Sequence, residues 1–195
     1  MTSQLSKKHS FDTVFDSQKV FRLILEAMSN PARVVGTKEF ADKLFGEYPA
    51  FLAVAMTLLD NESCFNVCGN QLLSDEIASL TLAKRTPMES ADFVFVCTAN
   101  DMEPVIQKAK CGTLSDPHKS ATVVIQNDGQ PVCQMALAGP GINGCTVVRM
   151  TQVVKDALAF RDMQNYEYPQ GIDLLFISDD GGLFSIPRLI QMEVQ

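Results

Sequence analysis

The chain has 195 residues and a formal net charge of −7 at pH 7, with 46% hydrophobic and 20% charged residues. This length suits one hydrophobic core, and the balance of apolar and charged residues is typical of a globular protein rather than a disordered one. The negative charge disfavours nucleic acids and anionic membrane surfaces as partners. No apolar run approaches the roughly 20 residues that a membrane-spanning helix requires.

The six cysteines raise the question of disulfides or a metal site. The first twenty residues lack the apolar stretch of a secretory signal, so we expect reduced thiols in a cytoplasmic protein. The closest pair, Cys64 and Cys68, does not have the C-x2-C spacing of zinc sites, and only His9 and His118 could add imidazole ligands. We therefore expect no metal site.

The first part of the chain predicts an arm followed by helices. Residues 1–10 are polar and lack periodicity, which predicts an N-terminal arm ahead of a single domain over residues 11–195. Apolar residues recur at three- and four-residue spacing over residues 17–28 and predict a helix that ends at Pro31. A second helix over residues 49–59 begins with a proline suited to its first turn and is apolar on nearly all sides, so it should be central.

The middle of the chain alternates between strand and helix patterns. Residues 64–68 predict a short strand, and Ser74 is the predicted N-cap of a helix that runs towards residues 84–85. Residues 93–97 (FVFVC) form a continuous apolar run, which is typical of a strand covered on both faces. A brief helix over residues 105–108 is expected next.

The third part of the chain predicts a hairpin and a helix. The strand-like segments 121–126 and 132–137 flank the turn-rich tetrad 127–130, so we expect an antiparallel hairpin. Residues 151–164 then predict an amphipathic helix, with Val154, Leu158 and Phe160 facing inward.

A second hairpin is predicted near the C-terminus. Its strands are residues 172–177 and 183–186, and its turn lies at residues 179–182. Because strands and helices alternate early and hairpins come late, we expect a mixed sheet with helices on both faces. The predicted fold class is a three-layer α/β/α sandwich.

The most unusual local sequence is the glycine loop, residues 138–144 (AGPGING). Its glycines could bring the N–H groups around Gly139, Gly141 and Ile142 close to a phosphate, as in anion-binding nests. The alternative is a sharp structural turn between packed elements, because the loop matches neither the Walker pattern nor GxGxxG and Pro140 lacks an N–H. Both interpretations stay open.

Three further residues are candidates for ligand binding. Asp173 begins an apolar strand and could either cap the preceding turn or face a site. Arg188 ends the last hairpin, where a guanidinium can hold a carboxylate or phosphate in a bidentate manner or be solvated. His118 follows Asp116 in a loop, but no nucleophile is marked by a G-x-S-x-G or cysteine signature. The sequence therefore predicts no catalytic residue of its own.

The first helix also offers a candidate contact surface. Phe21 and Arg22 lie side by side, and Arg22 is away from the main apolar stripe of the helix. This placement favours a subunit contact or a surface salt bridge over catalysis.

Five segments in chain order resemble the PhnH family, a subunit of the bacterial carbon–phosphorus lyase system for phosphonate breakdown. They are residues 21–31 (FRLILEAMSNP), 58–60 (LLD), 139–142 (GPGI), 169–173 (PQGID) and 186–188 (IPR). The chain departs from the family pattern at two positions. It has Ala32 where the family often has glycine, and Gln170 where the family often has leucine.

The resemblance implies a fold like the large domain of pyridoxal-phosphate-dependent transferases without the cofactor site, so no cofactor is expected. A Schiff-base lysine needs an enclosed or otherwise activating setting. None of the following lysines has such a setting in the predicted elements: Lys84, Lys108, Lys110, Lys119 and Lys155.

The resemblance also implies partners and a role. The partners are PhnG-, PhnI- and PhnJ-type subunits of a transferase complex of the ribose 1-methylphosphonate 5-triphosphate synthase type. In this complex an alkylphosphonate is coupled to the ribose of ATP with release of adenine. The chain would be an accessory subunit without autonomous activity, homodimeric when isolated and able to bind nucleotide or phosphonate. The alternative is an independent enzyme that places Arg188, Asp173 and the glycine loop around a phosphorylated substrate.

Overall fold

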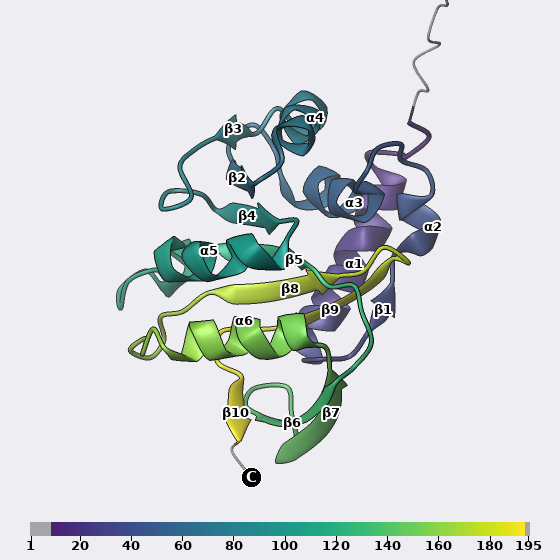
Figure 1. The fold of residues 1–195 in the computed structure, drawn as a ribbon. Coiled ribbons are helices and arrows are strands. Elements are labelled where there is room, and N and C mark those ends of the chain that lie inside the picture. Colours follow the sequence, from purple (N-terminus) through teal and green to yellow (C-terminus); the bar gives the residue numbers. More distant parts are fainter. Residues whose placement is uncertain (1–8, 194–195) are drawn as a thin grey trace, which may run out of the picture.

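The computed structural model of the chain describes residues 9–193, which contain two β-sheets (Figure 1). The larger sheet consists of β1 (Val35–Gly36), β2 (Cys64–Cys68), β3 (Lys84–Arg85), β4 (Phe93–Val96), β5 (Thr122–Gln126), β8 (Asp173–Ile177) and β9 (Gly182–Ile186). The smaller sheet consists of β6 (Cys133–Ala138), β7 (Cys145–Met150) and β10 (Gln191–Glu193). The α-helices are α1 (Phe15–Ser29), α2 (Lys38–Ala41), α3 (Pro49–Leu58), α4 (Gln71–Thr81), α5 (Met102–Lys108) and α6 (Gln152–Asp162), and the 3-10 helices are η1 (Ala99–Asp101) and η2 (Pro117–Lys119). Most of the predicted arm, residues 1–8, lies outside the described residues.

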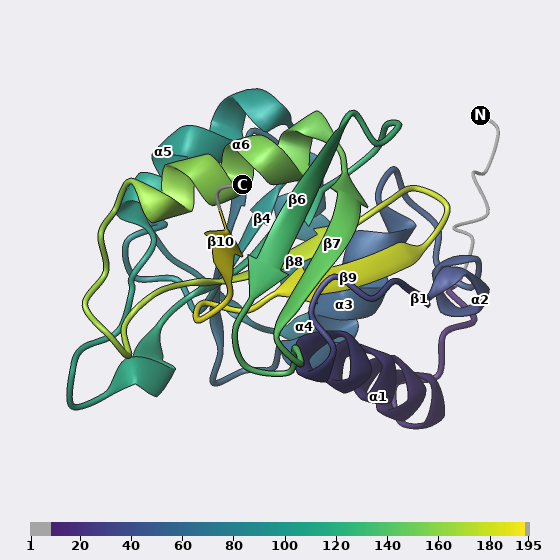
Figure 2. The same cartoon turned by 90° about the horizontal axis from the view of Figure 1, so that it is seen from below.

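The larger sheet is mixed, as the sequence predicts. Its strands lie in the order β1-β9-β8-β5-β4-β2-β3; β9 is antiparallel to both neighbours and the other pairs are parallel. Side chains that alternate along β4, β5 and β8 enter two separate hydrophobic clusters. One cluster includes α1, α3 and α4, whereas the other includes α5, α6 and the smaller sheet (Figure 2). The apolar run at residues 93–97 is therefore covered on both faces, as predicted.

Helix α1 confirms the first predicted helix. Val20, Ile24 and Ala27 face the core at the expected spacing, and the helix ends just before Pro31. Ala32 has φ +64°, in the left-handed region that favours glycine. This position is where the family often has glycine, so the turn is kept at some conformational cost.

Helix α3 confirms the prediction of a central helix. It begins with Pro49 at its first turn, and residues 50–55 are all buried. Phe51 packs edge-on against Phe95 of β4, with ring centroids 5.7 Å apart. Although α3 is strongly apolar, within residues 9–193 no helix combines the length and the apolar character that crossing a membrane requires.

The predicted start and end of α4 are wrong. Its N-cap is Asn70 rather than Ser74, because the Asn70 side-chain oxygen accepts a hydrogen bond of 2.9 Å from the Leu73 N–H. Ser74 lies inside the helix and is buried. The helix stops at Leu82, which adopts φ +62°, so residues 84–85 belong to strand β3 and not to the helix.

The first predicted hairpin is also wrong. Strand β5 pairs in parallel with β4 and β8, whereas β6 pairs with β7 and β10 in the other sheet. The tetrad 127–130 therefore joins two sheets instead of two neighbouring strands. Turn residues predict that the chain turns, but they do not identify the strand with which the next segment pairs.

The later elements confirm their predictions. Strands β8 and β9 form the second hairpin, in which Leu174 lies opposite Ile186 and Ile177 lies opposite Leu183. Helix α6 starts after Thr151, whose side-chain oxygen accepts a hydrogen bond from an N–H of the first turn. Its Val154 and Leu158 side chains are fully buried and Phe160, at the far end of the helix, is half-buried.

Candidate functional site

Asp173 and Arg188, two of the predicted ligand-binding residues, form an ion pair with each other. Arg188 Nε donates to Asp173 Oδ1 at 3.2 Å, Nη2 donates to Oδ2, and the backbone N–H of Arg188 donates to Oδ1 at 2.9 Å. The two side chains are only 17% and 11% exposed. Arg188 Nη1 also donates to the carbonyl of Pro117 in η2. The pair thus ties the start of β8 to the segment after β9 and to a distant turn.

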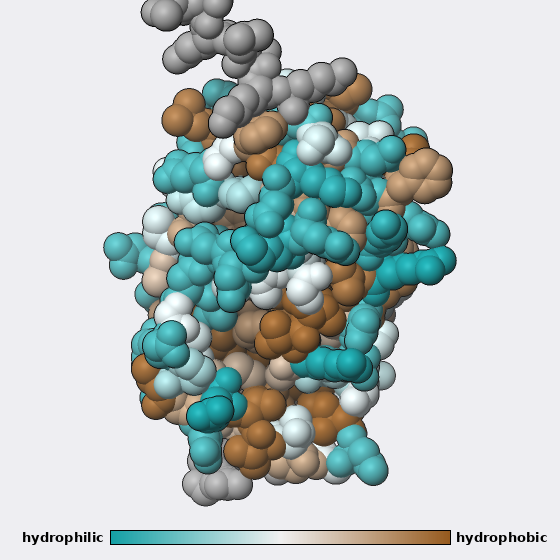
Figure 3. Space-filling model, turned by 90° about the vertical axis from the view of Figure 1, so that its right-hand side faces the viewer, coloured by the Kyte–Doolittle hydropathy of each residue, from teal (hydrophilic) through white to brown (hydrophobic). Residues whose placement is uncertain are grey.

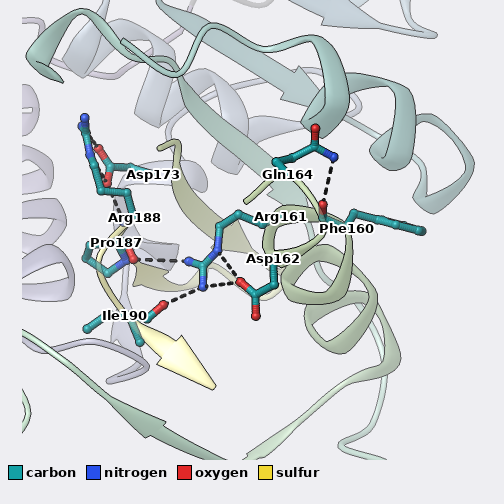
Figure 4. Close-up of polar contacts among 8 residues, drawn as sticks. All are labelled: Phe160, Arg161, Asp162, Gln164, Asp173, Pro187, Arg188 and Ile190. Atoms are coloured by element: carbon teal, nitrogen blue, oxygen red, sulfur yellow. Dashed lines mark hydrogen bonds and ion pairs between the residues drawn. The ribbon is translucent and has the colours of Figure 1, made fainter. Parts of the chain in front are cut away.

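Arg161 is a buried residue that the sequence analysis missed. It lies in the last turn of α6, is 3% exposed, and donates to the carbonyls of Ile190 at 2.6 Å and Pro187 at 3.3 Å (Figure 4). Asp162 Oδ1 accepts from Arg161 Nε and Nη2 at 3.3 and 3.2 Å. Burial lowers the pKa of the Arg161 guanidinium, and Asp162 opposes that effect. The signal was present in the sequence, because Arg161 lies seven residues after Val154, on the buried stripe of α6.

A pocket of about 650 Å³ lies beside these two arginines. Its wall comes from the end of β6 and the glycine loop, from the end of α6 and the segment that follows, and from residues 188–192. Arg161, Arg188 and Gly139 are among its lining residues. The pocket therefore brings together segments that are about 20 to 50 residues apart, and a volume of this size suits a small-molecule ligand.

Two tyrosines line the same pocket and differ in environment. Tyr166 is partly buried and donates to the carbonyl of Ile106 at 3.4 Å; burial raises the pKa of its hydroxyl to about 12. Tyr168 is 76% exposed. Tyr166 is thus part of the packed wall, whereas Tyr168 contacts solvent.

The glycine loop is the turn of the β6–β7 hairpin, and its glycines allow close packing. A Cβ atom on Gly139 would lie 2.7 Å from the carbonyl oxygen of Leu189. A Cβ atom on Gly141 would lie 2.7 Å from the Ser29 carbonyl oxygen, at the end of α1, and both glycines have positive φ. The Ile142 N–H donates to the Gly139 carbonyl at 3.1 Å, so it is already used within the turn. These contacts favour the interpretation as a structural turn.

The predicted site residues therefore separate into groups. Gly139 and Arg188 line the pocket, and Asp173 lies directly behind Arg188. Gly141 and Ile142 pack towards the end of α1 and the core instead. His118 is exposed in η2 and does not line the pocket, although its neighbour Pro117 accepts the hydrogen bond from Arg188.

The predicted contact residues Phe21 and Arg22 are both exposed on α1. Phe21 is 44% exposed, and two other apolar side chains near it in the chain are exposed as well. Leu25 on α1 is 49% exposed, and Val14, just before α1, is 68% exposed. Their spacing of seven and four residues places them on one side of the helix. Hydrophobic side chains also gather near the middle of the face that carries α2 and β1 (Figure 3). Exposed apolar surface of this kind is typical of protein contacts.

Comparison with known proteins identifies the family. Residues 9–193 match the model of the family described as "Bacterial phosphonate metabolism protein (PhnH)". The chain is also 28% identical over 165 residues to a protein of Stutzerimonas stutzeri named "Putative C-P lyase subunit protein HtxG". The matched residues make up 83% of this chain and 78% of that protein. The family match, over residues 9–193, includes the pocket, the ion pair and the glycine loop. The chain therefore belongs to the PhnH family of bacterial phosphonate metabolism proteins.

Proposed function

We propose that the chain is an accessory subunit of the carbon–phosphorus lyase core complex, where it supports the coupling of an alkylphosphonate to the ribose of ATP with release of adenine. The observation that carries this proposal is the PhnH family match over residues 9–193. A relative named as a C-P lyase subunit supports it. The complex would be a transferase of the ribose 1-methylphosphonate 5-triphosphate synthase type in the cytoplasm.

The contacts of the charged candidates support an accessory role rather than autonomous catalysis. Asp173 and Arg188 bond each other, and Arg188 and Arg161 also hold backbone carbonyls. A general base needs a side chain with a free basic atom within reach of the proton that it removes. Asp173 is instead engaged by the side chain and the backbone of Arg188.

The expected partners are PhnG-, PhnI- and PhnJ-type subunits, and a second copy of the chain when it is isolated. The proposed contact region consists of Phe21, Arg22 and Leu25 on α1 and of Val14 just before it, because the apolar side chains of this group are exposed. The glycine loop belongs to the same region, since Gly141 packs against the end of α1.

The proposed fold class is the three-layer sandwich that resembles the large domain of pyridoxal-phosphate-dependent transferases. The mixed seven-stranded sheet supports it, as do the helices that share a hydrophobic cluster with each of its faces. We propose that the chain works without that cofactor.

A co-purification experiment tests the partners and the contact region. Tagged chain co-expressed with the three partner subunits should retain them, and Phe21→Glu should reduce their recovery at least tenfold, because it places a charge in an apolar contact. Leu72→Glu is the matched control: Leu72 is 77% exposed on α4 and its substitution should leave recovery unchanged.

Two outcomes would contradict this part of the account. Equal recovery with both variants would remove α1 from the contact region. If the wild-type chain stays alone and turns over a phosphorylated compound, it is an independent enzyme. This second candidate function is favoured by the pocket that Arg188 and Gly139 line, with Asp173 directly behind Arg188.

A further inference from the structure

The pocket beside Arg161 and Arg188 has the composition of a binding site for a small organic anion. Part of its wall is apolar, with Pro140, Leu189 and Met192, and part is charged, with the two arginines. Small-molecule sites have this form, in which apolar walls supply most of the contact and a few polar groups fix the orientation.

The two guanidiniums are held in place by the protein. Arg188 is held by Asp173 and the Pro117 carbonyl, and Arg161 by Asp162 and two carbonyls of the C-terminal segment. Because these contacts come from backbone carbonyls, from the buried Asp173 and from Asp162, which neighbours Arg161 in the chain, neither arginine has to be ordered when a ligand binds.

Both arginines keep donor groups for a ligand. A guanidinium carries five N–H groups. Within residues 9–193, the side-chain hydrogen bonds of Arg188 use one N–H each on Nε, Nη1 and Nη2. One N–H therefore stays free on Nη1 and one on Nη2. Those of Arg161 leave one N–H on Nη1. These are the donors with which arginine binds carboxylate and phosphate oxygens.

The charged groups at the pocket can hold an anion although the chain as a whole is negative. Arg161, Arg188 and Asp162 are the charged residues that line the pocket within residues 9–193. Asp173, directly behind Arg188, brings the formal charge of these four side chains to zero. Because the charge of the distant surface is screened, the attraction for an anion comes from the two guanidiniums and their free N–H groups, and we expect moderate affinity.

We propose that this pocket binds an organic phosphonate or phosphate ester, with the phosphorus oxyanion on Arg188 and Arg161 and the organic group on the apolar wall. The choice of a phosphorus oxyanion over a carboxylate rests on the proposed function in phosphonate metabolism. Methylphosphonate and ATP represent the two sources of this chemistry.

Calorimetric titration of the purified full chain tests the site with methylphosphonate, ATP and inorganic phosphate as separate probes. At least one of the two organic probes should bind at a single site, more tightly than inorganic phosphate. Tyr168→Glu should weaken that binding about threefold or more and Tyr168→Lys should strengthen it, because a charge added at the pocket changes its electrostatic attraction for an anion. Tyr168 is 76% exposed, so neither variant should disturb the fold.

The matched control is the same pair of changes at Gln130, an exposed residue of a second hollow of about 420 Å³. Gln130→Glu and Gln130→Lys change the net charge equally and should leave the affinity unchanged. If the Gln130 pair shifts binding as much as the Tyr168 pair, or if neither organic probe binds at millimolar concentration, the proposed site is wrong. Binding of inorganic phosphate as tight as that of both organic probes would remove the role of the apolar wall. Because the isolated chain is titrated, such failures leave the accessory role in the complex to be judged separately.

Discussion

Replacing Asp173 with asparagine is expected to lower the free energy of unfolding by about 3–5 kcal/mol, because it leaves the largely buried Arg188 guanidinium without its counter-charge. The substitution keeps the size of the side chain, so packing is little changed. Urea unfolding followed by circular dichroism measures the difference, and the slope of the unfolding transition should stay the same.

The control for Asp173 is an ion pair on the surface. Asp42 pairs with Lys38 at 3.2 Å, and both side chains are more than 60% exposed. Asp42→Asn should change the free energy of unfolding by less than about 1 kcal/mol. If Asp173→Asn costs no more than Asp42→Asn, the ion pair does not tie the C-terminal segment to β8 as described above.

Replacing Gly141 with alanine is expected to cost about 2–4 kcal/mol of stability. The new Cβ atom would meet the Ser29 carbonyl oxygen at 2.7 Å, and alanine is strained at φ +85°. Thermal and urea unfolding of the variant measure the loss. This loss should be the same with and without phosphonate or nucleotide, because it comes from the contact between the glycine loop and α1.

Gly144 provides the comparison within the same loop. It has φ +75°, but a Cβ atom there would meet nothing within 4 Å. Gly144→Ala should therefore cost only the conformational part, about 1–2 kcal/mol. Equal losses at Gly141 and Gly144 would show that the close approach to Ser29 is not what requires glycine.

The elements that the sequence predicted correctly depend on local patterns. The periodic spacing of α1, the N-terminal proline of α3 and the continuous apolar run at residues 93–97 each mark an element within a short window. The first hairpin failed because its turn residues are local, whereas the pairing of β5 with β8 joins residues about 50 positions apart. The cap of α4 failed because Asn70 and Ser74 are both suitable N-cap residues, and the chain uses the earlier one.

The candidate site was only partly predictable, for the same reason. The second hairpin already implied that Asp173 lies opposite the segment after residue 186, so its pairing with Arg188 follows from the register. Arg161 could have been found on the buried stripe of α6, seven residues after Val154. The packing of Gly141 against Ser29 could not, because nothing in either segment marks a contact between residues more than 100 positions apart.

The release of adenine from ATP and an alkylphosphonate by the reconstituted complex tests the central claim most directly. The PhnG-, PhnI- and PhnJ-type subunits are incubated with ATP and methylphosphonate, with and without this chain, and free adenine is measured over time. The account predicts that adenine release depends on the chain, is restored when the purified chain is added back, and is absent with the chain alone. Equal release with and without the chain would contradict an accessory role in the coupling reaction.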